Sequence, residues 1–381
     1  MATQITNYQC PACTGPLQFD AATGKMGCEY CGASYSIEEI EAMFAEKNAQ
    51  AEQNMADAKV KAESGTGDAW DMSGLNDNWG EEAKGLRTYS CPACCAELVC
   101  DETTAATSCP YCGNPTVIPG QFAGMLKPDF VIPFKLKKED AIAALKKHYE
   151  GKPLLPDAFK SANHLQEIKG VYVPFWLFNG GAEGDLIAAA TRSETYRSGD
   201  YKVTETSHFE LVRSGSMAFE NIPVDGSTKM PDDYMDSIEP FRYDEMVPFS
   251  TAYLPGYMAD KYDLTAEQCT QRADLRAENT VESSLRGTMF GYDSIVTVNR
   301  DIRLFRGEVK YALLPVWLLT TKWKDQTYLF AMNGQTGKFV GNLPEDKGKK
   351  WRKFGVVYAI AAAITAAVVL FPGGLLNLLG M

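Results

Sequence analysis

Eight cysteines in two matched sets constrain this 381-residue chain more than any other feature. Each set has two Cys-x-x-Cys units with fourteen residues between the inner cysteines, and adding 81 to the first set gives the second. Between the aligned segments 8–33 and 89–114, twelve of 26 positions are identical. The sequence therefore contains an internal repeat of one small unit. Its cysteines are Cys10, Cys13, Cys28 and Cys31 in the first copy, and Cys91, Cys94, Cys109 and Cys112 in the second.

This spacing predicts two zinc ribbons that bind two Zn²⁺ ions in all. A Cys-x-x-Cys turn directs two thiolates at one ion, and two such turns joined by a short hairpin complete a tetrahedral shell. A unit of about 26 residues is too short to fold by apolar burial alone, so metal binding would supply the folding free energy. A closed four-cysteine site is structural and not catalytic. Disulfides, a redox-active pair and an iron site are the alternatives.

Three cysteines lie outside this repeat. Cys95 and Cys100 are predicted to be small buried residues, with a redox role as the alternative. Cys95 also directly follows Cys94, so it competes with it as a candidate ligand. Cys269 falls in a predicted helix and is expected to be structural.

The charge distribution separates an acidic N-terminal third from a nearly neutral remainder. Residues 1–130 carry seven Lys plus Arg against eighteen Asp plus Glu, which is −11 of the total net charge of −12. Zinc bound by four thiolates would make this region more acidic still. Because such a surface repels a phosphate backbone, nucleic-acid binding is not expected, and the ribbons are predicted to dock proteins.

Composition and periodicity predict an α+β protein with a capped helix and a polar linker after the first ribbon. Trp70 and Trp79 in that linker are either docking anchors or residues that pack on the neighbouring domain, and we favour packing. The predicted segments are zinc ribbon 1 (1–35), an amphipathic helix (36–63), a flexible acidic linker (64–86), zinc ribbon 2 (87–120), a mixed α+β domain with an antiparallel sheet (121–343), a basic juxtamembrane collar (344–353) and a transmembrane anchor with its tail (354–381).

The α+β domain shows signs of a second, weaker duplication. Pro133-Phe134, a predicted helix and the segment 172–177 parallel Pro248-Phe249, a predicted helix and the segment 311–318. The segment 332–339 lacks the first glycine and the Ser or Thr of a phosphate-binding loop, so it is predicted to be a hairpin turn. No motif for an active site is recognised, and the chain is predicted not to be an enzyme. The scattered histidines are His148, His164 and His208, and the residues of a predicted solvated acidic loop are Asp225, Asp232, Asp233 and Asp236.

The C-terminal segment is predicted to cross a membrane. Residues 354–371 carry no charge, and eighteen helical residues span about 27 Å, close to the hydrocarbon thickness. A buried core helix is the alternative. Cations precede this segment and none follows it, which places the N-terminal bulk in the cytoplasm. The reduced thiols agree with that compartment. We therefore expect a single-pass protein of the cell membrane.

The chain resembles a family of bacterial membrane-anchored proteins with TFIIB-type zinc ribbons, often labelled primosomal-protein-N′-like or helicase-like. The residues that carry the resemblance are CPACCAELVCDETTAATSCPYCGN (91–114), VIPFKLKKEDA (131–141), YVPFWLF (172–178), and LLPVWLL with AMNGQTGKFVG (313–341). No helicase motor motif is present. Some members resemble partners of phage-shock-protein-A-type and SPFH proteins. The resemblance implies that such proteins are recruited to the membrane during envelope stress, and that relatives usually carry Gly at the position of Cys95.

These observations predict a non-enzymatic, tail-anchored, zinc-binding adaptor or scaffold at the cytoplasmic face of the membrane. One alternative is a nucleic-acid-binding zinc-ribbon protein of replication or transcription. The other is a sensor that responds to thiol oxidation or zinc.

Overall fold

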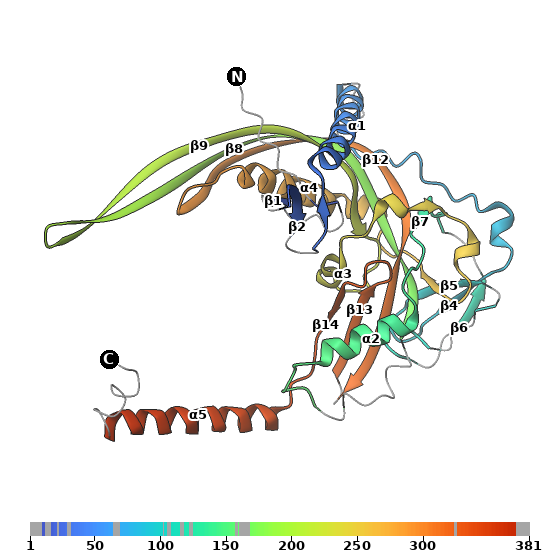
Figure 1. Cartoon of the computed structure of the whole chain (residues 1–381). Helices are drawn as coiled ribbons and strands as arrows, with labels where there is room; N and C mark the ends of the chain where they lie inside the picture. The colour runs from blue at the N-terminus through green and yellow to red at the C-terminus, as the bar shows by residue number, and fades with distance from the viewer. Residues whose placement is uncertain are drawn as a thin grey trace.

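The computed structural model shows an α+β protein built on one large mixed sheet (Figure 1). It describes residues 10–11, 17–20, 23–28, 32–63, 69–101, 103–104, 108–114, 118–121, 125–156, 159, 168–323 and 326–370.

Eleven strands form the large sheet. They are β4 (Leu86–Ser90), β5 (Glu97–Asp101), β6 (Ile118–Gln121), β7 (Phe130–Val131), β8 (Lys169–Ser198), β9 (Tyr201–Asp225), β10 (Val247–Pro248), β11 (Met258–Asp260), β12 (Ser294–Trp323), β13 (Gln326–Asn333) and β14 (Phe339–Gly341). The main order is β10-β7-β12-β8-β11-β5-β4-β6, with β9 beside β8 and β13 between β12 and β14. The β7–β12 and β8–β11 pairs are parallel, so the predicted antiparallel sheet is in fact mixed.

The helices and the first ribbon lie around this sheet. The helices are α1 (Ile37–Glu63), α2 (Lys138–Tyr149), α3 (Asp232–Ile238), α4 (Ala266–Gly287) and α5 (Lys347–Leu370), with short 3₁₀ turns η1 (Gly80–Ala83), η4 (Tyr243–Glu245) and η5 (Thr251–Tyr253). A separate three-stranded sheet consists of β1 (Leu17–Asp20), β2 (Lys25–Cys28) and β3 (Ser34–Tyr35). The predicted capping boxes are confirmed, because Ser36 and Glu39, and Thr265 and Gln268, exchange hydrogen bonds.

Both faces of the central strands are buried, which explains their nearly continuous apolar sequences. Val171, Val173 and Phe175 of β8 pack on one face, and Tyr172 and Trp176 pack on the other. The described part of the linker completes the second face. Its two tryptophans are buried there: Trp70 Nε1 donates to Asp274 Oδ1 and Trp79 Nε1 donates to the Met125 carbonyl, both at 2.9 Å. Packing, and not docking, accounts for both side chains.

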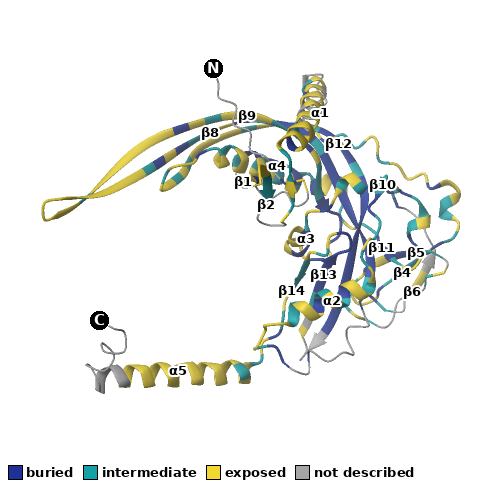
Figure 2. Ribbon diagram, viewed as in Figure 1, coloured by how far each residue is buried: buried dark blue, intermediate teal, exposed yellow. Residues whose placement is uncertain are grey.

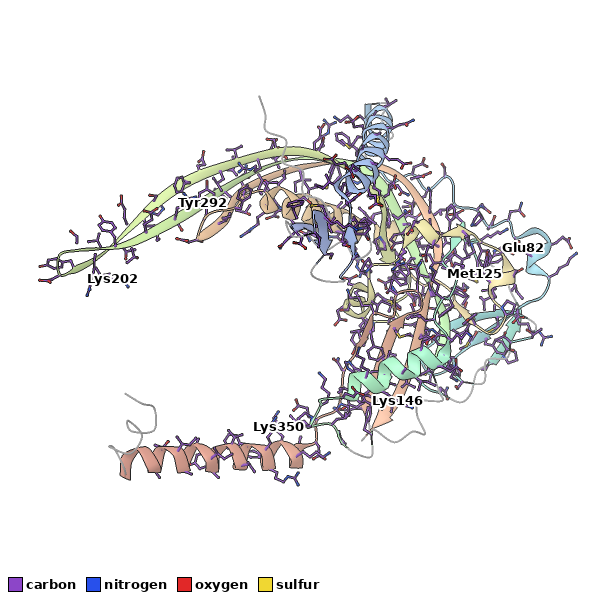
Figure 3. All side chains as sticks on the ribbon, in the orientation of Figure 1. Glu82, Met125, Lys146, Lys202, Tyr292 and Lys350 are labelled. Atoms are coloured by element: carbon purple, nitrogen blue, oxygen red, sulfur yellow. The ribbon has the colours of Figure 1, made fainter. Side chains whose placement is uncertain are left out.

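A curved arm projects from the body (Figure 1). It consists of β8, β9 and the first half of β12, and α4 covers part of one face, where its Ala277 and Val281 pack with Ala182 and Phe219. Beyond Thr191 only β8 and β9 continue, and residues 193–207 are almost all exposed (Figure 2). Lys202 lies near the tip of the arm (Figure 3).

The body contains two structural repeats. Repeat A is β7-α2-β8-β9 and repeat B is β11-α4-β12-β13. The first strand of each repeat pairs in parallel with the long strand of the other: β7 pairs with β12 and β11 pairs with β8, while the two long strands pair antiparallel. The weak duplication seen in the sequence is therefore real. Its first strand in repeat B is β11, however, and not the segment at Pro248-Phe249.

The same hydrogen bonds recur in the two repeats. Trp176 Nε1 of repeat A donates to the Leu264 carbonyl at 2.9 Å, and Trp317 Nε1 of repeat B donates to the Leu136 carbonyl at 3.1 Å. The N–H of Gly226 donates to the Pro174 carbonyl at 2.8 Å. Gly334 N–H and the Pro315 carbonyl form the equivalent bond at 2.8 Å. The two halves thus satisfy their buried polar groups in the same way.

The prediction of a membrane span is wrong. The cations Lys347, Lys349, Lys350, Arg352 and Lys353 lie within the first two turns of α5. Across the described residues, no helix is both long and apolar enough to cross a membrane. The predicted single-pass location in the cell membrane is corrected on the same ground.

Candidate metal centre

Four cysteines of ribbon 2 converge on one point. The Sγ atoms of Cys91, Cys94, Cys109 and Cys112 all lie within 4.8 Å of one another. Two of the sulfur–sulfur distances, Cys91–Cys112 and Cys94–Cys109, are 3.6 Å. A disulfide would bring the sulfurs to about 2.05 Å, whereas a tetrahedron with Zn–S bonds of about 2.3 Å has edges of about 3.8 Å. The geometry therefore fits one tetrahedral zinc ion.

Two turns of the same kind present these sulfurs. In the first, the Cys91 carbonyl accepts from the N–H of Cys95 at 2.9 Å, and in the second the Cys109 carbonyl accepts from the N–H of Gly113 at 3.0 Å. Both donor residues have a left-handed backbone conformation, with φ of 57° at Cys95 and 68° at Gly113. Glycine adopts this conformation freely and other residues do not, so a glycine would relieve strain at position 95.

The thiols of the cluster differ in how readily they ionise. Burial raises the pKa of Cys91, but hydrogen bonds from the backbone of Cys94 and Ala93 outweigh it and lower the pKa to about 6. Burial raises the pKa of Cys109 to about 11 and that of Cys94 further. One thiolate thus forms near neutral pH, and the charge of the ion would deprotonate the others.

Ribbon 2 is part of the large sheet. Its strand β5 pairs with β4 on one side and with β11 of repeat B on the other. Cys91, Cys109 and Tyr111 belong to the main core cluster. The hydroxyl of Thr320 lies 2.6 Å from the Pro110 carbonyl and 2.9 Å from the Tyr111 carbonyl, which fixes the second turn against β12. Ribbon 2 is therefore a wall of the body.

The partners that hold ribbon 2 were not foreseen from the sequence. Lys169 Nζ donates to the Ser108 carbonyl at 2.7 Å, and Asn114 Nδ2 donates weakly to Cys91 Sγ at 3.9 Å. Lys169 and Thr320 lie 60 or more residues from the turns they contact, and no local pattern marks them. Asn114 could have been predicted from the sequence, because it directly follows the glycine of the second turn.

The first unit is described only in part. Cys10 and Cys28 are buried, with 1% and 4% of their surface exposed, and pack with Leu17 and Ile40. The turn after Cys28 repeats the one in ribbon 2, because its carbonyl accepts from the N–H of Gly32, with φ of 73°, at 2.9 Å. The other two predicted ligands, Cys13 and Cys31, lie outside the described residues. The described residues thus contain one four-cysteine cluster where two were predicted, and half of the ligands of the other predicted cluster lie outside them.

The remaining cysteines are single thiols. Cys100 is buried as predicted, and Cys269 is buried in α4, the helix predicted for it; burial raises the pKa of each to about 12. Cys95 is exposed, contrary to prediction, and it is not one of the four cysteines of the cluster. The predicted acidic loop is also corrected: Asp232–Ile238 form α3, and the buried Asp225 pairs with Arg272 at 2.5 Å.

Comparison with known proteins agrees with a zinc-ribbon protein. The family model of Trm112p-like proteins matches residues 9–39, which include the first unit. The uncharacterized protein YdjG of Bacillus subtilis (strain 168) is 34% identical over 371 residues, covering 97% of this chain and 99% of that protein. No solved structure matches the chain. Because this likeness covers nearly the whole length of both proteins, the chain belongs to the YdjG family.

Proposed function

We propose that the chain is a zinc-binding adaptor that docks protein partners and catalyses no reaction. The observation that carries the proposal is the closed sulfur cluster. Four sulfurs around one ion leave no open position for water or substrate, so the ion acts as a structural support. The support holds ribbon 2 in the sheet, and the acidic first third of the chain provides a charged surface for partners.

Proteins of the phage-shock-protein-A type and the SPFH type are the first partners to test, because the resemblance drawn from the sequence points to them. The test is co-purification of the tagged, zinc-loaded full chain with each purified candidate. Cys91→Ser removes one ligand, and Cys269→Ser is the control because its thiol is buried in α4, away from the cluster.

We expect Cys91→Ser to reduce capture strongly and Cys269→Ser to leave it unchanged. The zinc content and the thermal transition of each variant are measured in parallel, so that a lost partner is not confused with an unfolded chain. Capture that persists in a folded, zinc-free Cys91→Ser protein would count against docking through ribbon 2.

The number of ions is part of the proposal. The cluster of ribbon 2 accounts for one zinc. The first unit would account for a second, since its turn from Cys28 to Gly32 has the same hydrogen bond as the turn from Cys109 to Gly113. Metal analysis of reduced protein decides this point. A content of two ions supports two ribbons, and a content of one assigns the metal to ribbon 2 alone.

A thiol or zinc sensor is the second candidate. The cluster would bind zinc through thiolates, the form of cysteine that reacts with oxidants, so oxidation would release the ion. Reversible zinc release by peroxide at physiological concentration, with restoration by reductant, would favour this function over a permanent scaffold.

A further inference from the structure

One cavity lies where ribbon 2 and the two repeats meet. It has a volume of 480 Å³, and its walls come from the ribbon 2 hairpin, the start of α2, the start of β8 and the segment that enters β11. The lining residues used below are Lys137, Lys138, Lys169, Gly170 and Tyr257. Pockets assembled from several rigid elements in this way are typical binding sites.

The lining is basic in a chain that is strongly acidic. Of the described residues that line the cavity, three are lysines and one, Glu139, is an acid, while the whole chain carries −12. The Nζ atom of Lys169 is held on the ribbon side by the Ser108 carbonyl at 2.7 Å.

The opposite wall is closely packed. A Cβ atom at Gly170 would lie 2.5 Å from the ring of Tyr257, so this position has no room for a side chain. The Tyr257 ring in turn stacks on Phe134, with ring centroids 4.2 Å apart. The wall is therefore rigid, and a ligand would enter a site formed in advance.

Repeat B shows what this scaffold looks like without the lysines. The positions of Lys137, Lys138 and Lys169 correspond to Thr265, Ala266 and Lys310, so one cation replaces three. Tyr311 occupies the position of Gly170 and Asp129 that of Tyr257, and Asp129 Oδ2 accepts from the Tyr311 N–H at 2.8 Å. Because repeat B folds with these residues, the fold does not require the lysines of repeat A.

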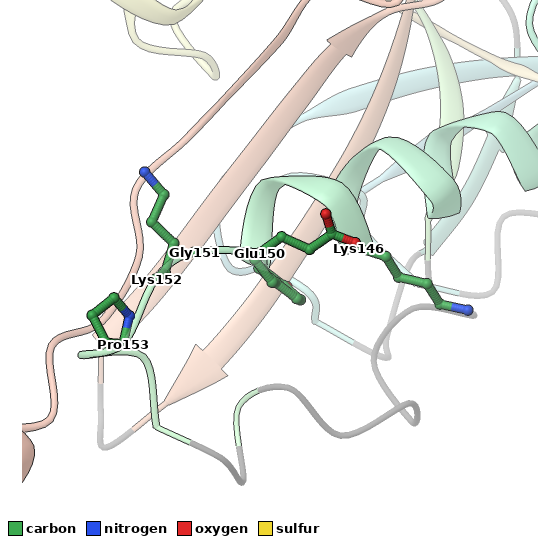
Figure 4. Close-up of a pocket in the computed structure, with 6 residues that line it drawn as sticks. Lys146, Glu150, Gly151, Lys152 and Pro153 are labelled. Carbon is green, nitrogen blue, oxygen red and sulfur yellow. The ribbon is translucent and has the colours of Figure 1, made fainter.

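A larger cavity of 630 Å³ at the other end of α2 is less suited to hold an anion. Its lysines, Lys146 and Lys152, point away from one another (Figure 4), and Glu150 lies between them. These cations do not converge on one ligand, so that cavity serves as the rival site in the test.

We propose that the cavity of 480 Å³ binds a small anion with phosphate or carboxylate groups, held by Lys137, Lys138 and Lys169. Each lysine acts as a point charge with three donors, which suits a ligand of multiple charge. This site is separate from the sulfur cluster, and it neither uses nor requires a protein partner.

The test is calorimetric titration of the zinc-loaded full chain at low ionic strength. Inorganic pyrophosphate and citrate are the probes, and sodium chloride of matched ionic strength is the blank. We expect saturable one-site binding of at least one probe. Lys137→Gln/Lys138→Gln should weaken it by about tenfold or more, because two of three cations are lost. Lys146→Gln/Lys152→Gln, with the same change of charge at the rival site, should stay within about twofold.

The stronger probe identifies the ligand chemistry, since pyrophosphate represents phosphates and citrate represents carboxylates. Zinc content and thermal transition are compared for all proteins. If the double variant does not fold, Lys137→Gln, whose side chain is exposed, takes its place. The proposal is overturned if neither probe gives more heat than chloride, or if the variants at the rival site weaken binding as much as those at the cavity.

Discussion

Repeats A and B of the body share a scaffold and differ in what they attach to it. In each repeat a tryptophan indole N–H donates a hydrogen bond to a carbonyl of the other repeat, and a glycine N–H donates to a proline carbonyl. The leading strand of repeat B pairs with ribbon 2, whereas that of repeat A pairs with the two residues of β10. The β8–β9 hairpin of repeat A extends into the arm, whereas the β12–β13 hairpin of repeat B is short. The shared contacts are those that the fold needs, and the differences are available for function.

The largest effect should follow from removing the metal that fastens ribbon 2 to repeat B. Cys109→Ser breaks the cluster at a residue of the main core. Since a structural zinc contributes on the order of 10 kcal/mol to a small domain, we expect the main thermal transition of the body to be lost or greatly lowered. Differential scanning calorimetry measures it.

The control is Cys28→Ser in the first unit, whose cluster contains only residues of that unit and α1. It should leave the main transition in place. If Cys28→Ser and Cys109→Ser lowered that transition equally, the two units would not differ in their attachment, and the comparison would fail.

The two indole contacts should be equivalent in energy. Trp176→Phe and Trp317→Phe each leave one partly buried carbonyl without its donor, which costs about 1–3 kcal/mol. We expect the two values, from urea unfolding, to agree within about 1 kcal/mol. Trp351→Phe on the exposed surface of α5 is the control and should change the free energy by less than about 0.5 kcal/mol. Values that differ severalfold would show that the repeats are not energetically alike.

At one buried position, repeat A has an acidic side chain and repeat B has a neutral one. Asp225 of repeat A corresponds to Asn333 of repeat B, and both are buried. Burial, opposed by Arg272, raises the pKa of Asp225 to about 6. Between pH 4 and that value the folded state keeps a proton that the unfolded state has lost. The contribution of this group to stability is therefore full below about pH 4 and is lost as the pH rises to about 6, by at most about 3 kcal/mol.

Asp225→Asn copies repeat B and should remove this slope. Urea midpoints of both proteins between pH 4 and 7 test the prediction, and Asp244→Asn at the surface is the control. Parallel pH profiles for wild type and Asp225→Asn would show that the buried carboxyl does not titrate in this range.

The smallest effect concerns the arm, the feature that most distinguishes repeat A. Glu194 lies directly opposite Glu205, and Arg197 lies opposite Lys202. Like charges in these positions destabilise a strand pair, and an opposite-charge pair would gain about 0.2–1 kcal/mol. Glu194→Lys should therefore slow amide exchange near the tip, while Thr195→Ser should not. Exchange that is unchanged or faster in Glu194→Lys would mean that these charges do not limit the stability of the arm.

Local patterns were read correctly from the sequence, and distant contacts were not. The ligands Cys91, Cys94, Cys109 and Cys112 follow from spacing alone, because a metal turn is fixed by four consecutive residues. Capping boxes and the 332–339 hairpin are local for the same reason. The lack of charge in 354–371 is also a local pattern, but the predicted basic collar is not a separate segment: its cations from Lys347 to Lys353 form the start of α5, and no helix of the described residues is long and apolar enough to cross a membrane.

The sequence by itself determined the repeated cysteine unit, the acidic first third and the type of most elements, since each depends on neighbours along the chain. Only the tertiary structure decided that ribbon 2 is a wall of the sheet, that β7 and β11 exchange partners between repeats, and that three lysines line one cavity. These facts depend on residues such as Lys169 and Ser108, which lie 61 positions apart. Such contacts arise from packing and strand pairing between distant segments, and the periodicity of a single segment does not encode them.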